Sequence, residues 1–417
     1  MRIAVVGTGI SGLVCAHVLG SVHEVTVFEA EDRPGGHSHT VRVTVDGREL
    51  AVDTGFLVYN ERTYPGLVRL FDELGVATKP SDMSFSVSDE ASGLEYRGTS
   101  AATVFAQRRN LVRPRFLRML ADVARFHRTG RRLLSDPPAP DYTLRHLLDD
   151  GGWSRAFVDW YLVPLCSSIW SADPSTFAEM PAATLLRFFD RHGMLSVGDK
   201  PAWRTVDGGA VTYVEAVLAP VRAAGRLRLS APVDRLLRTD TGVEVTVAGR
   251  RPEPFDHVVV ATHSDQALAM LADATRDEKE VLGDIAYQPN RVTLHTDARL
   301  MPRNRRAWAA WNYHRPAGGA DRVTMTYHLN RLQGVEGNTP VLVTLNRDDE
   351  IDPARVLRSF DYSHPVIDAA AVAAQARHAE ISGRDRISFA GAYWRSGFHE
   401  DGVQSALDVC RRLGVAW

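Results

Sequence analysis

The chain opens with a hydrophobic pattern that predicts two strands joined by a helix. Ile3 to Val6 is a short, fully apolar run, a glycine-rich segment follows, and Leu13 to Leu19 has the pattern of a helix. Val25 to Phe28 is a second apolar run rich in β-branched residues. Because about 30 residues suffice for two parallel strands and one crossover helix, we predict a βαβ unit here.

Farther along, two segments interrupt this pattern, and short apolar strands resume after each of them. The first segment, from Thr63 to about Lys200, is mostly helical. The second, from about Asp265 to Arg384, contains strands with alternating polar and apolar residues. We therefore predict one discontinuous domain built from three pieces, interrupted by a second domain built from two. The predicted bounds are 1–62, 201–264 and 385–417 for the first domain, and 63–200 and 265–384 for the second.

Composition and charge exclude several classes of protein. The chain has 417 residues, 44% hydrophobic and 24% charged, which fits a globular protein with two domains. No apolar stretch reaches the ~20 residues of a membrane span, and no secretory pattern opens the chain. Cys15, Cys166 and Cys410 lack CxxC spacing, so no disulfide framework or metal site is predicted. These cysteines fit a reducing cytoplasm best. The net charge of −2 gives no global reason to bind nucleic acid.

The glycine-rich segment has the spacing of a dinucleotide-binding turn. Gly7 permits the tight turn, Gly9 lets the backbone approach a pyrophosphate, and Gly12 lets the helix pack on the strand. The helix N-terminus then offers free N–H groups and a positive dipole end to phosphates. Glu29 ends the second strand 17 residues after Gly12 and can accept hydrogen bonds from ribose hydroxyls. An acidic residue at this place disfavours a 2′-phosphate.

Further motifs narrow the choice of dinucleotide. Glu29 and Ala30 lead into a charged run and the paired glycines Gly35 and Gly36, and Val52-Asp53-Thr54-Gly55 follows. Further segments, different from these, lie at Val233, at Ala261, at Gly208-Gly209, at Phe389–Ala392 and at Gly397–Val403. In these motifs the whole chain resembles the FAD-containing amine-oxidase superfamily.

The resemblance implies a fold, a cofactor and a set of contacts. The fold is α/β, a glutathione-reductase-like two-domain flavoprotein with a Rossmann-type FAD domain and a mixed α+β substrate domain. The cofactor is FAD, bound non-covalently because no Cys or His stands at an obvious flavin-linking position. The expected cofactor-binding residues are Gly7, Gly9, Ile10, Ser11, Gly12, Glu29, Ala30, Gly36, His37, Gly55, Phe56, Val233, Ala261, Gly391, Asp401, Gly402 and Val403. We expect the helix at Asp401–Val403 to direct its N–H groups at the flavin ring.

More narrowly, the chain resembles a bacterial branch of flavoproteins often encoded beside cyclopropane-fatty-acyl-phospholipid synthases. Strings such as Trp311-Asn312-Tyr313 and Asn330-Arg331-Leu332-Gln333 carry this match. The chain also departs from amine oxidases, which commonly keep a Lys that holds a water at flavin N5. The matching strand, Asn290 to His295, has no Lys. His295 is therefore the candidate catalytic residue.

These features leave three functional classes open. The first is hydride transfer from a lipophilic substrate, such as a fatty-acyl phospholipid, to flavin N5 by an oxidase or desaturase. The second is an amine or amino-acid oxidase. The third is a non-enzymatic, flavin-bound partner of a lipid methyltransferase. No second GxGxxG follows Gly12, so we expect the electrons to come from the substrate rather than from a pyridine nucleotide.

One segment breaks the near neutrality of the chain. Residues 108–132 contain nine arginines and one acidic residue, Asp122. Pro114 is a suitable helix start, and the apolar residues Phe116, Met119, Leu120 and Val123 follow at helical spacing. This pattern is typical of a helix that lies on an anionic bilayer, and equally of a helix whose apolar face packs on its own domain. The first alternative predicts peripheral contact with the inner membrane face.

Overall fold

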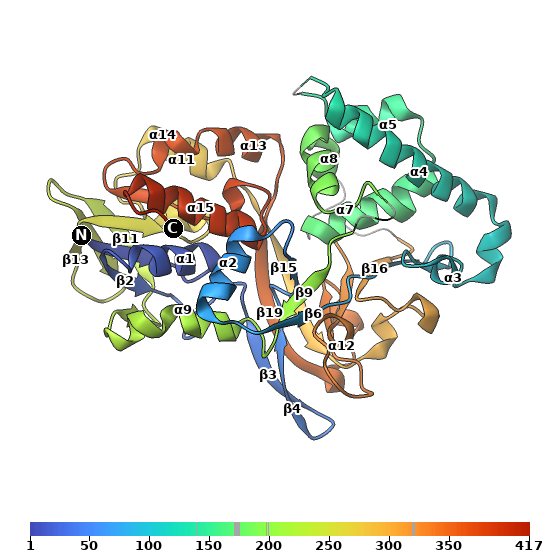
Figure 1. Cartoon of the computed structure of the whole chain (residues 1–417), viewed down its shortest axis with the longest axis horizontal. Helices are drawn as coiled ribbons and strands as arrows, with labels where there is room; N and C mark the ends of the chain where they lie inside the picture. The colour runs from blue at the N-terminus through green and yellow to red at the C-terminus, as the bar shows by residue number, and fades with distance from the viewer. Residues whose placement is uncertain (140, 171–175, 197, 199, 319–321) are drawn as a thin grey trace.

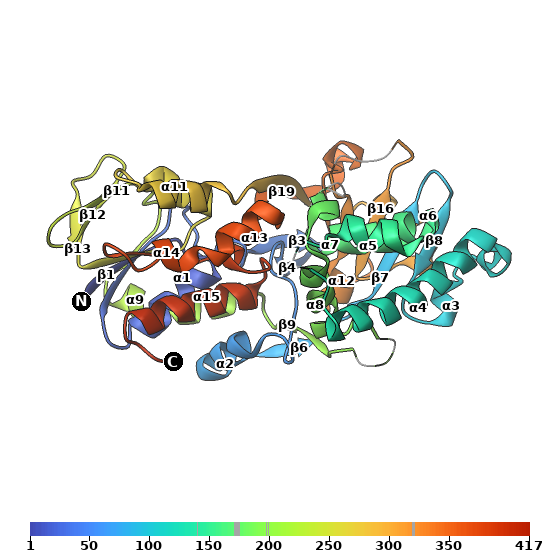
Figure 2. The same cartoon turned by 90° about the horizontal axis from the view of Figure 1, so that it is seen from above.

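The computed structural model describes the chain except for residues 140, 171–175, 197, 199 and 319–321. Both termini lie in one half of the molecule, beside a parallel sheet, and a group of helices forms the far end of the other half (Figures 1 and 2). Two long antiparallel strands, β15 (Tyr287–His295) and β19 (Val356–Pro365), run between the halves. The mixed α/β architecture predicted from the sequence is confirmed.

The first half is built on a five-stranded parallel sheet with the order β10-β2-β1-β14-β20. Its strands are β1 (Arg2–Val6), β2 (Glu24–Phe28), β10 (Leu227–Arg228), β14 (His257–Val260) and β20 (Ile387–Phe389). Helix α1 (Ile10–Leu19) connects β1 to β2, as the hydrophobic pattern predicts. The buried residues of these strands are mainly apolar because both faces of the sheet are covered.

Alternate residues of the strands pack into two different cores. Ile3 and Val5 of β1 face helices α1, α9 (Val211–Ala223), α15 (His399–Arg412) and α2 (Pro65–Leu74). Ala4 and Val6 face the antiparallel sheet of β11 (Val233–Arg238), β12 (Val243–Val247) and β13 (Glu253–Phe255), with α10 (Ser264–Met270), α11 (Arg276–Gly283), α13 (Ala369–Ala376) and α14 (His378–Ile381). Helices α2, α11, α13 and α14 thus pack around the parallel sheet although their sequences fall within the predicted ranges 63–200 and 265–384.

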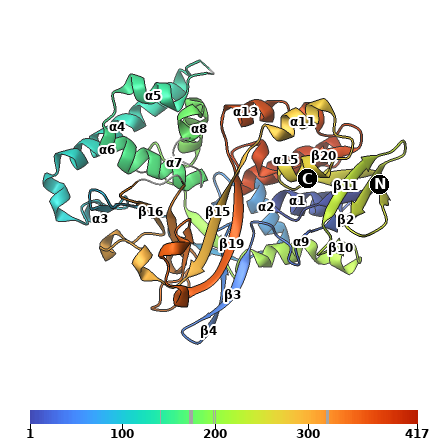
Figure 3. The ribbon, with the colours of Figure 1, turned by 180° about the vertical axis from the view of Figure 1, so that it is seen from behind.

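The second half contains a seven-stranded sheet with the order β19-β15-β18-β17-β16-β7-β8 (Figure 3). Beside β15 and β19, its strands are β18 (Leu342–Leu345), β17 (Met325–His328), β16 (Trp311–Arg315), β7 (Phe85–Asp89) and β8 (Leu94–Arg97). Only β16 and β7 pair in parallel; the other neighbours are antiparallel. Hairpin β3 (Thr40–Val45)–β4 (Arg48–Asp53) and the small sheet of β5 (Tyr59–Asn60), β9 (Trp203–Val206) and β6 (Thr78–Pro80) join the halves.

A helical layer lies over one side of this sheet. It comprises α3 (Ala101–Val104), the 3-10 turn η1 (Arg108–Val112), α4 (Pro114–Ser135), α5 (Leu144–Gly151), α6 (Arg155–Phe157), α7 (Val163–Trp170) and α8 (Ala182–Arg191). Helix α4 begins at Pro114, as predicted, because proline needs no hydrogen-bond partner in the first turn. Within the described part of the chain, no helix is long and apolar enough to cross a membrane.

Candidate flavin and substrate site

In the glycine turn between β1 and α1, two glycines are needed for close packing and the third faces open space. Gly7 has a φ of +98°, and a Cβ at Gly12 would lie 2.0 Å from the carbonyl oxygen of Gly7. These two glycines are therefore required by the close contact of strand and helix. A Cβ at Gly9, in contrast, would have no atom within 4 Å. Gly9 thus faces open space, where a bound group can approach the backbone.

Glu29 lies at the end of β2 and organises the loops around this turn. Its carboxylate accepts hydrogen bonds from the backbone N–H of Thr8 at 3.0 Å and from that of Glu31 at 3.0 Å. The Thr8 hydroxyl also donates to Glu29 and accepts from the N–H of Gly35 at 2.9 Å. The two loops that carry the glycine motifs are therefore joined through Thr8, whose role the sequence did not indicate.

A cavity of about 710 Å³ runs along the carboxyl edge of the parallel sheet, past the N-terminus of α1. Eleven of the predicted cofactor-binding residues line it: Gly7, Gly9, Ile10, Ser11, Glu29, Ala30, Gly36, His37, Val233, Ala261 and Gly391. Helix α1 has no side-chain cap and no acidic residue in its first turn. Its positive end is therefore available to a phosphate.

The remaining predicted cofactor contacts lie elsewhere. Gly12 packs beneath the turn, and Gly55 and Phe56 line a second cavity. Asp401, Gly402 and Val403 are among the described lining residues of neither cavity. Contacts within the protein explain why these three residues face neither cavity. The Asp401 carboxylate accepts from the N–H of Phe398 at 3.0 Å, a Cβ at Gly402 would lie 2.6 Å from Ile10, and Val403 is fully buried.

At this helix N-terminus, the residues that face the cavities are Gly397, Phe398 and His399. We therefore correct the expected contact from 401–403 to 397–399. The Asp401 carboxylate faces neither cavity because it accepts a hydrogen bond from the backbone N–H of Phe398 at the start of its own helix.

Four partly buried histidines gather around the end of the cofactor cavity: His37, His263, His364 and His399. The ring of His37 lies 5.3 Å from that of His364 and 5.9 Å from that of His263. Burial lowers the pKa of His364 to about 4 and that of His399 to about 3, and it holds the pKa of His37 well below 6.5. These rings are therefore neutral at neutral pH, so they offer hydrogen bonds without charge.

The residues present fit a dinucleotide with a polar ring system. Nε2 of His37 is buried and has no hydrogen-bond partner among the described residues, which is costly unless a ligand supplies one. Gly9 leaves room for a group against the backbone, and the N-terminus of α1 lacks an acidic cap. FAD needs these three features: a ring partner, a close approach and an anion site.

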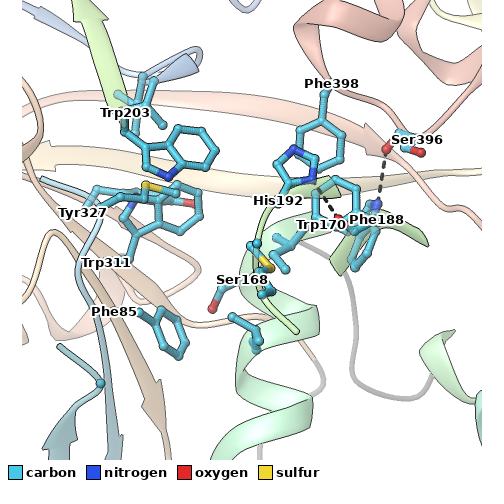
Figure 4. A pocket seen from close by; sticks show the side chains of 18 of the residues that line it. Phe85, Ser168, Trp170, Phe188, His192, Trp203, Trp311, Tyr327, Ser396 and Phe398 are labelled. Carbon is cyan, nitrogen blue, oxygen red and sulfur yellow. Dashed lines mark hydrogen bonds between the residues drawn. The ribbon is translucent and has the colours of Figure 1, made fainter. Parts of the chain in front are cut away.

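The second cavity, of about 670 Å³, lies between the seven-stranded sheet and helices α4, α7 and α8. Seven residues line both cavities, so the two spaces meet: His37, Tyr362, His364, Pro365, Gly397, Phe398 and His399. One end is bounded by Phe85, Trp203, Trp311 and Tyr327, and the other by Trp170, Phe188, His192 and Phe398, with Ser168 of α7 between them (Figure 4).

The described lining of the second cavity is mainly apolar and carries no acidic side chain. Its described lining residues include no Asp and no Glu, and Lys200 is the one Lys or Arg among them. The hydroxyl of Ser168 donates to the carbonyl of Pro164 in its own helix at 2.6 Å. Among the described lining residues, a cationic substrate would find no carboxylate as counter-ion, whereas a long hydrocarbon chain would find aromatic and aliphatic walls.

The candidate catalytic residue His295 lies away from this site. It is fully buried at the end of β15 and lines neither cavity among the described residues. Both ring nitrogens have protein partners: Nε2 lies 2.7 Å from the Thr344 hydroxyl, and Nδ1 accepts from the N–H of Asp297 at 3.0 Å. His295 is thus a satisfied core residue, and the geometry gives it no catalytic role. Val292, earlier on β15, is the residue that reaches the cavity.

The predicted apolar face of 108–132 points inward. Phe116 and Met119 are fully buried, and Met119, Leu120 and Val123 line the second cavity. This face of α4 therefore packs on its own domain and forms a wall of the substrate space. The expectation that these four residues contact a bilayer is wrong.

Fold and site together define a flavoprotein oxidoreductase with a separate substrate cavity. The family model of flavin containing amine oxidoreductases matches residues 10–414, so the chain belongs to that family. FAD is the cofactor that this family implies, as predicted. The chain is 29% identical over 387 residues to "Putative flavin-containing monoamine oxidase AofH" of Mycobacterium tuberculosis, covering 86% of this chain and 73% of that protein. It is also 34% identical over 104 residues to the flavin-dependent L-tryptophan oxidase RebO of Lentzea aerocolonigenes, covering 25% of this chain and 21% of that protein.

Solved structures show the same fold at low identity. The cyclohexylamine oxidase from Brevibacterium oxydans superposes with a TM-score of 0.68 at 16% identity, and the match covers 99% of each chain. A fatty acid isomerase from P. acnes that produces CLA superposes with a TM-score of 0.71 at 18% identity, again over 99% of each chain. One fold therefore serves an amine oxidase and an enzyme that acts on fatty acids.

Non-covalent binding of FAD is a prediction for the purified protein. The three cysteines are buried, and none is among the described residues that line the cofactor cavity. We expect acid precipitation to release the whole flavin into the supernatant as FAD, measured by absorbance and chromatography. Flavin that stays with the protein pellet would contradict this prediction and would direct attention to the four histidines of the cavity.

Acid should destabilise the folded protein between about pH 6.5 and about pH 4. The unfolded chain takes up protons on histidine as the pH falls through 6.5, whereas the folded chain resists protonation of buried rings until about pH 4, so stability present above pH 6.5 is lost. A pKa near 4 also holds for His39, His257, His295, His314, His328 and His378. Asp53 and Asp401 oppose the trend, because burial raises their pKa to about 6, but they are outnumbered.

The measurement is the thermal unfolding midpoint across this pH range. A midpoint that stays constant, or rises as the pH falls from 6.5, would contradict the assignment of neutral, buried histidines.

Proposed function

We propose that this protein is an FAD-dependent oxidoreductase acting on a long apolar substrate, with a fatty-acyl chain as the leading class. The observation that carries the proposal is the second cavity: about 670 Å³, walled by aromatic and aliphatic side chains, with no described carboxylate, and meeting the cofactor cavity along seven shared residues. Its volume falls within the ~300–1,000 Å³ of ligand pockets. The resemblance to flavoproteins encoded beside cyclopropane-fatty-acyl-phospholipid synthases favours an acyl chain on a phospholipid.

The protein side chains that line the second cavity would position the substrate and exclude water. Bound FAD would supply the two-electron acceptor for oxidation of the substrate. The neutral rings at the junction, such as His399 stacked on Phe56 with centroids 3.7 Å apart, close the space without adding charge. The aromatic residues Trp311 and Tyr327, packed edge to face at 4.8 Å, form a rigid wall against which a hydrocarbon chain can lie.

An amine or amino-acid oxidase is the second candidate, favoured by the names of the relatives AofH and RebO. Two observations weigh against it. The second cavity offers no described acidic side chain to an ammonium or α-amino group. Of the three lysines, Lys79 pairs with Asp207 at 2.9 Å, Lys279 is exposed on α11, and Lys200 is an exposed residue at the cavity wall. A flavin-bound partner of a lipid methyltransferase remains a further hypothesis that shares the apolar cavity.

The proposal is tested by binding saturated chains of increasing length to the FAD-loaded protein. Octanoate, dodecanoate and octadecanoate should perturb the flavin absorbance with rising affinity, because each buried CH₂ contributes about 0.8 kcal/mol. Linear primary amines of the same lengths are the comparison series, and they should bind more weakly because the described lining of the cavity offers them no carboxylate. Affinity that is independent of chain length, or that is higher for the amines, would contradict the proposal.

A further inference from the structure

A convex surface at the far end of the helical layer combines exposed apolar side chains with arginines. It comprises residues 108–118, which form η1 and the first turns of α4, and is called the arginine tip below. Figures 1 and 2 place the α3–α4 region at the end of the molecule opposite the parallel sheet and both termini. The tip can therefore meet a flat surface without obstruction from the FAD half.

Apolar exposure is concentrated at this tip. The described part of the chain has six exposed large hydrophobic residues, and three of them lie here: Leu111 at 53%, Val112 at 81% and Leu117 at 42%. The others, Met1, Val22 and Val356, are far apart in the sequence. Single exposed apolar residues are ordinary on a soluble protein, whereas three together mark an interaction surface.

The charge of the tip is wholly positive. Its eleven residues include five arginines and no acidic residue. Arg118 pairs with Asp122, Arg113 lies over the Trp160 ring at 5.0 Å, and Arg109 donates to the carbonyl of Gly93. Arg108 and Arg115 are exposed and have no ion-pair or hydrogen-bond partner among the described residues. Two free cations thus flank the exposed apolar side chains.

We propose that the arginine tip docks on an anionic lipid bilayer, inserting Leu111, Val112 and Leu117 at the interface while Arg108 and Arg115 contact lipid head groups. Apolar burial and about 1 kcal/mol per basic residue near an anionic surface act together. The occupant is a bilayer rather than a nucleic acid, because a phosphate backbone binds arginines but offers no apolar surface to the exposed Leu and Val side chains. This surface uses the opposite side of α4 from the one predicted from the sequence.

The tip also adjoins the substrate cavity. Met119, Leu120 and Val123 line that cavity from the inner side of α4, two to six residues beyond the exposed Leu117. Docking would therefore bring the membrane against the helix that walls the substrate space. The statement that the docked bilayer supplies the substrate rests on the proposed function, whereas docking itself does not.

The test is co-sedimentation of the FAD-loaded protein with phosphatidylcholine vesicles and with mixed phosphatidylcholine–phosphatidylglycerol vesicles, at low and high salt. We expect salt-sensitive binding to the mixed vesicles only. Arg108→Gln with Arg115→Gln should weaken it about thirtyfold, since two charges at ~1 kcal/mol each are removed. Leu111→Ser with Val112→Ser should weaken it about tenfold. The matched controls, Arg250→Gln with Arg251→Gln and Val22→Ser with Val356→Ser, change exposed residues elsewhere and should bind like the wild type.

Three results would overturn the docking surface. They are no binding to mixed vesicles, equal binding to neutral and mixed vesicles, or control variants that lose as much vesicle binding as the tip variants. Binding that is sensitive to salt but unchanged by the Leu111 and Val112 substitutions would also overturn it, because it would indicate a polyanion site without insertion. Vesicle binding without any effect of lipid on the flavin would instead overturn the proposed function and leave the tip in place. Flavin reduction by detergent-dispersed lipid without vesicle binding would overturn the docking surface and leave the proposed function in place.

Discussion

Gly9→Ala should leave the protein folded while weakening FAD binding by a factor of ten or more, about 1.4 kcal/mol or above. Gly9 has a φ of −59° and a ψ of 171°, which alanine adopts without strain, and its Cβ would meet no protein atom within 4 Å. In the apo-protein the methyl group therefore costs almost nothing. With FAD bound it occupies the space that the backbone leaves for the pyrophosphate.

Two other glycine substitutions make this result interpretable. Gly12→Ala places a Cβ 2.0 Å from the carbonyl oxygen of Gly7, so it should disrupt the turn and lower both the unfolding temperature and the FAD content. Gly283→Ala, at the end of helix α11, brings its Cβ no closer than 3.9 Å to Leu268 and should change neither. The measurements are the apo-protein unfolding midpoint and a fluorescence titration with FAD. If Gly9→Ala bound FAD like the wild type, the turn would not be the pyrophosphate site.

Ser168→Asp should weaken the binding of a long acyl chain at least about tenfold, because a carboxylate in an apolar cavity must either lose its hydration or keep water where the chain would lie. Ser168 is 2% exposed and lies on α7 between the two aromatic ends of the cavity (Figure 4). It does not line the cofactor cavity among the described residues, so the FAD content should stay unchanged.

Ser168→Asn is the matched control, since it has nearly the same volume and no charge. The two variants should differ more as the pH rises, because burial raises the pKa of a carboxyl group and the charge appears only above it. The measurement is the dissociation constant of dodecanoate, from the flavin absorbance, at mildly acidic and alkaline pH. Equal affinity for the Asp and Asn variants across this range would show that the chain binds somewhere else.

The hydrophobic pattern was sufficient to predict the parallel sheet, because the buried strands of such a sheet are mainly apolar runs. Ile3–Val6, Val25–Phe28 and Val258–Val260 all lie where predicted. Domain membership was harder to predict. Helix α2 packs with α1 and α15 through Leu67 and Leu70, a contact between distant parts of the sequence that local periodicity does not encode.

The cofactor turn could be predicted for a different reason: the glycines and Glu29 act within one short loop, so their spacing specifies their geometry. The junction of the two cavities depends on residues that come together only in the fold. Tyr362 and His364 lie on β19, His399 at the start of α15 and His37 after the paired glycines. His295 illustrates the converse: the strand register places this titratable residue opposite Leu342, and its ring lies in the core, hydrogen-bonded to the hydroxyl of Thr344.

The most direct test of the central claim is the flavin spectrum after anaerobic mixing of the FAD-loaded protein with candidate substrates. The panel comprises phospholipids with saturated, unsaturated and cyclopropane-modified acyl chains, a linear primary amine and L-tryptophan. The account predicts loss of the oxidised flavin band with at least one acyl lipid and none with the amine or the amino acid. Rapid loss of that band with the primary amine, and with no lipid, would contradict it.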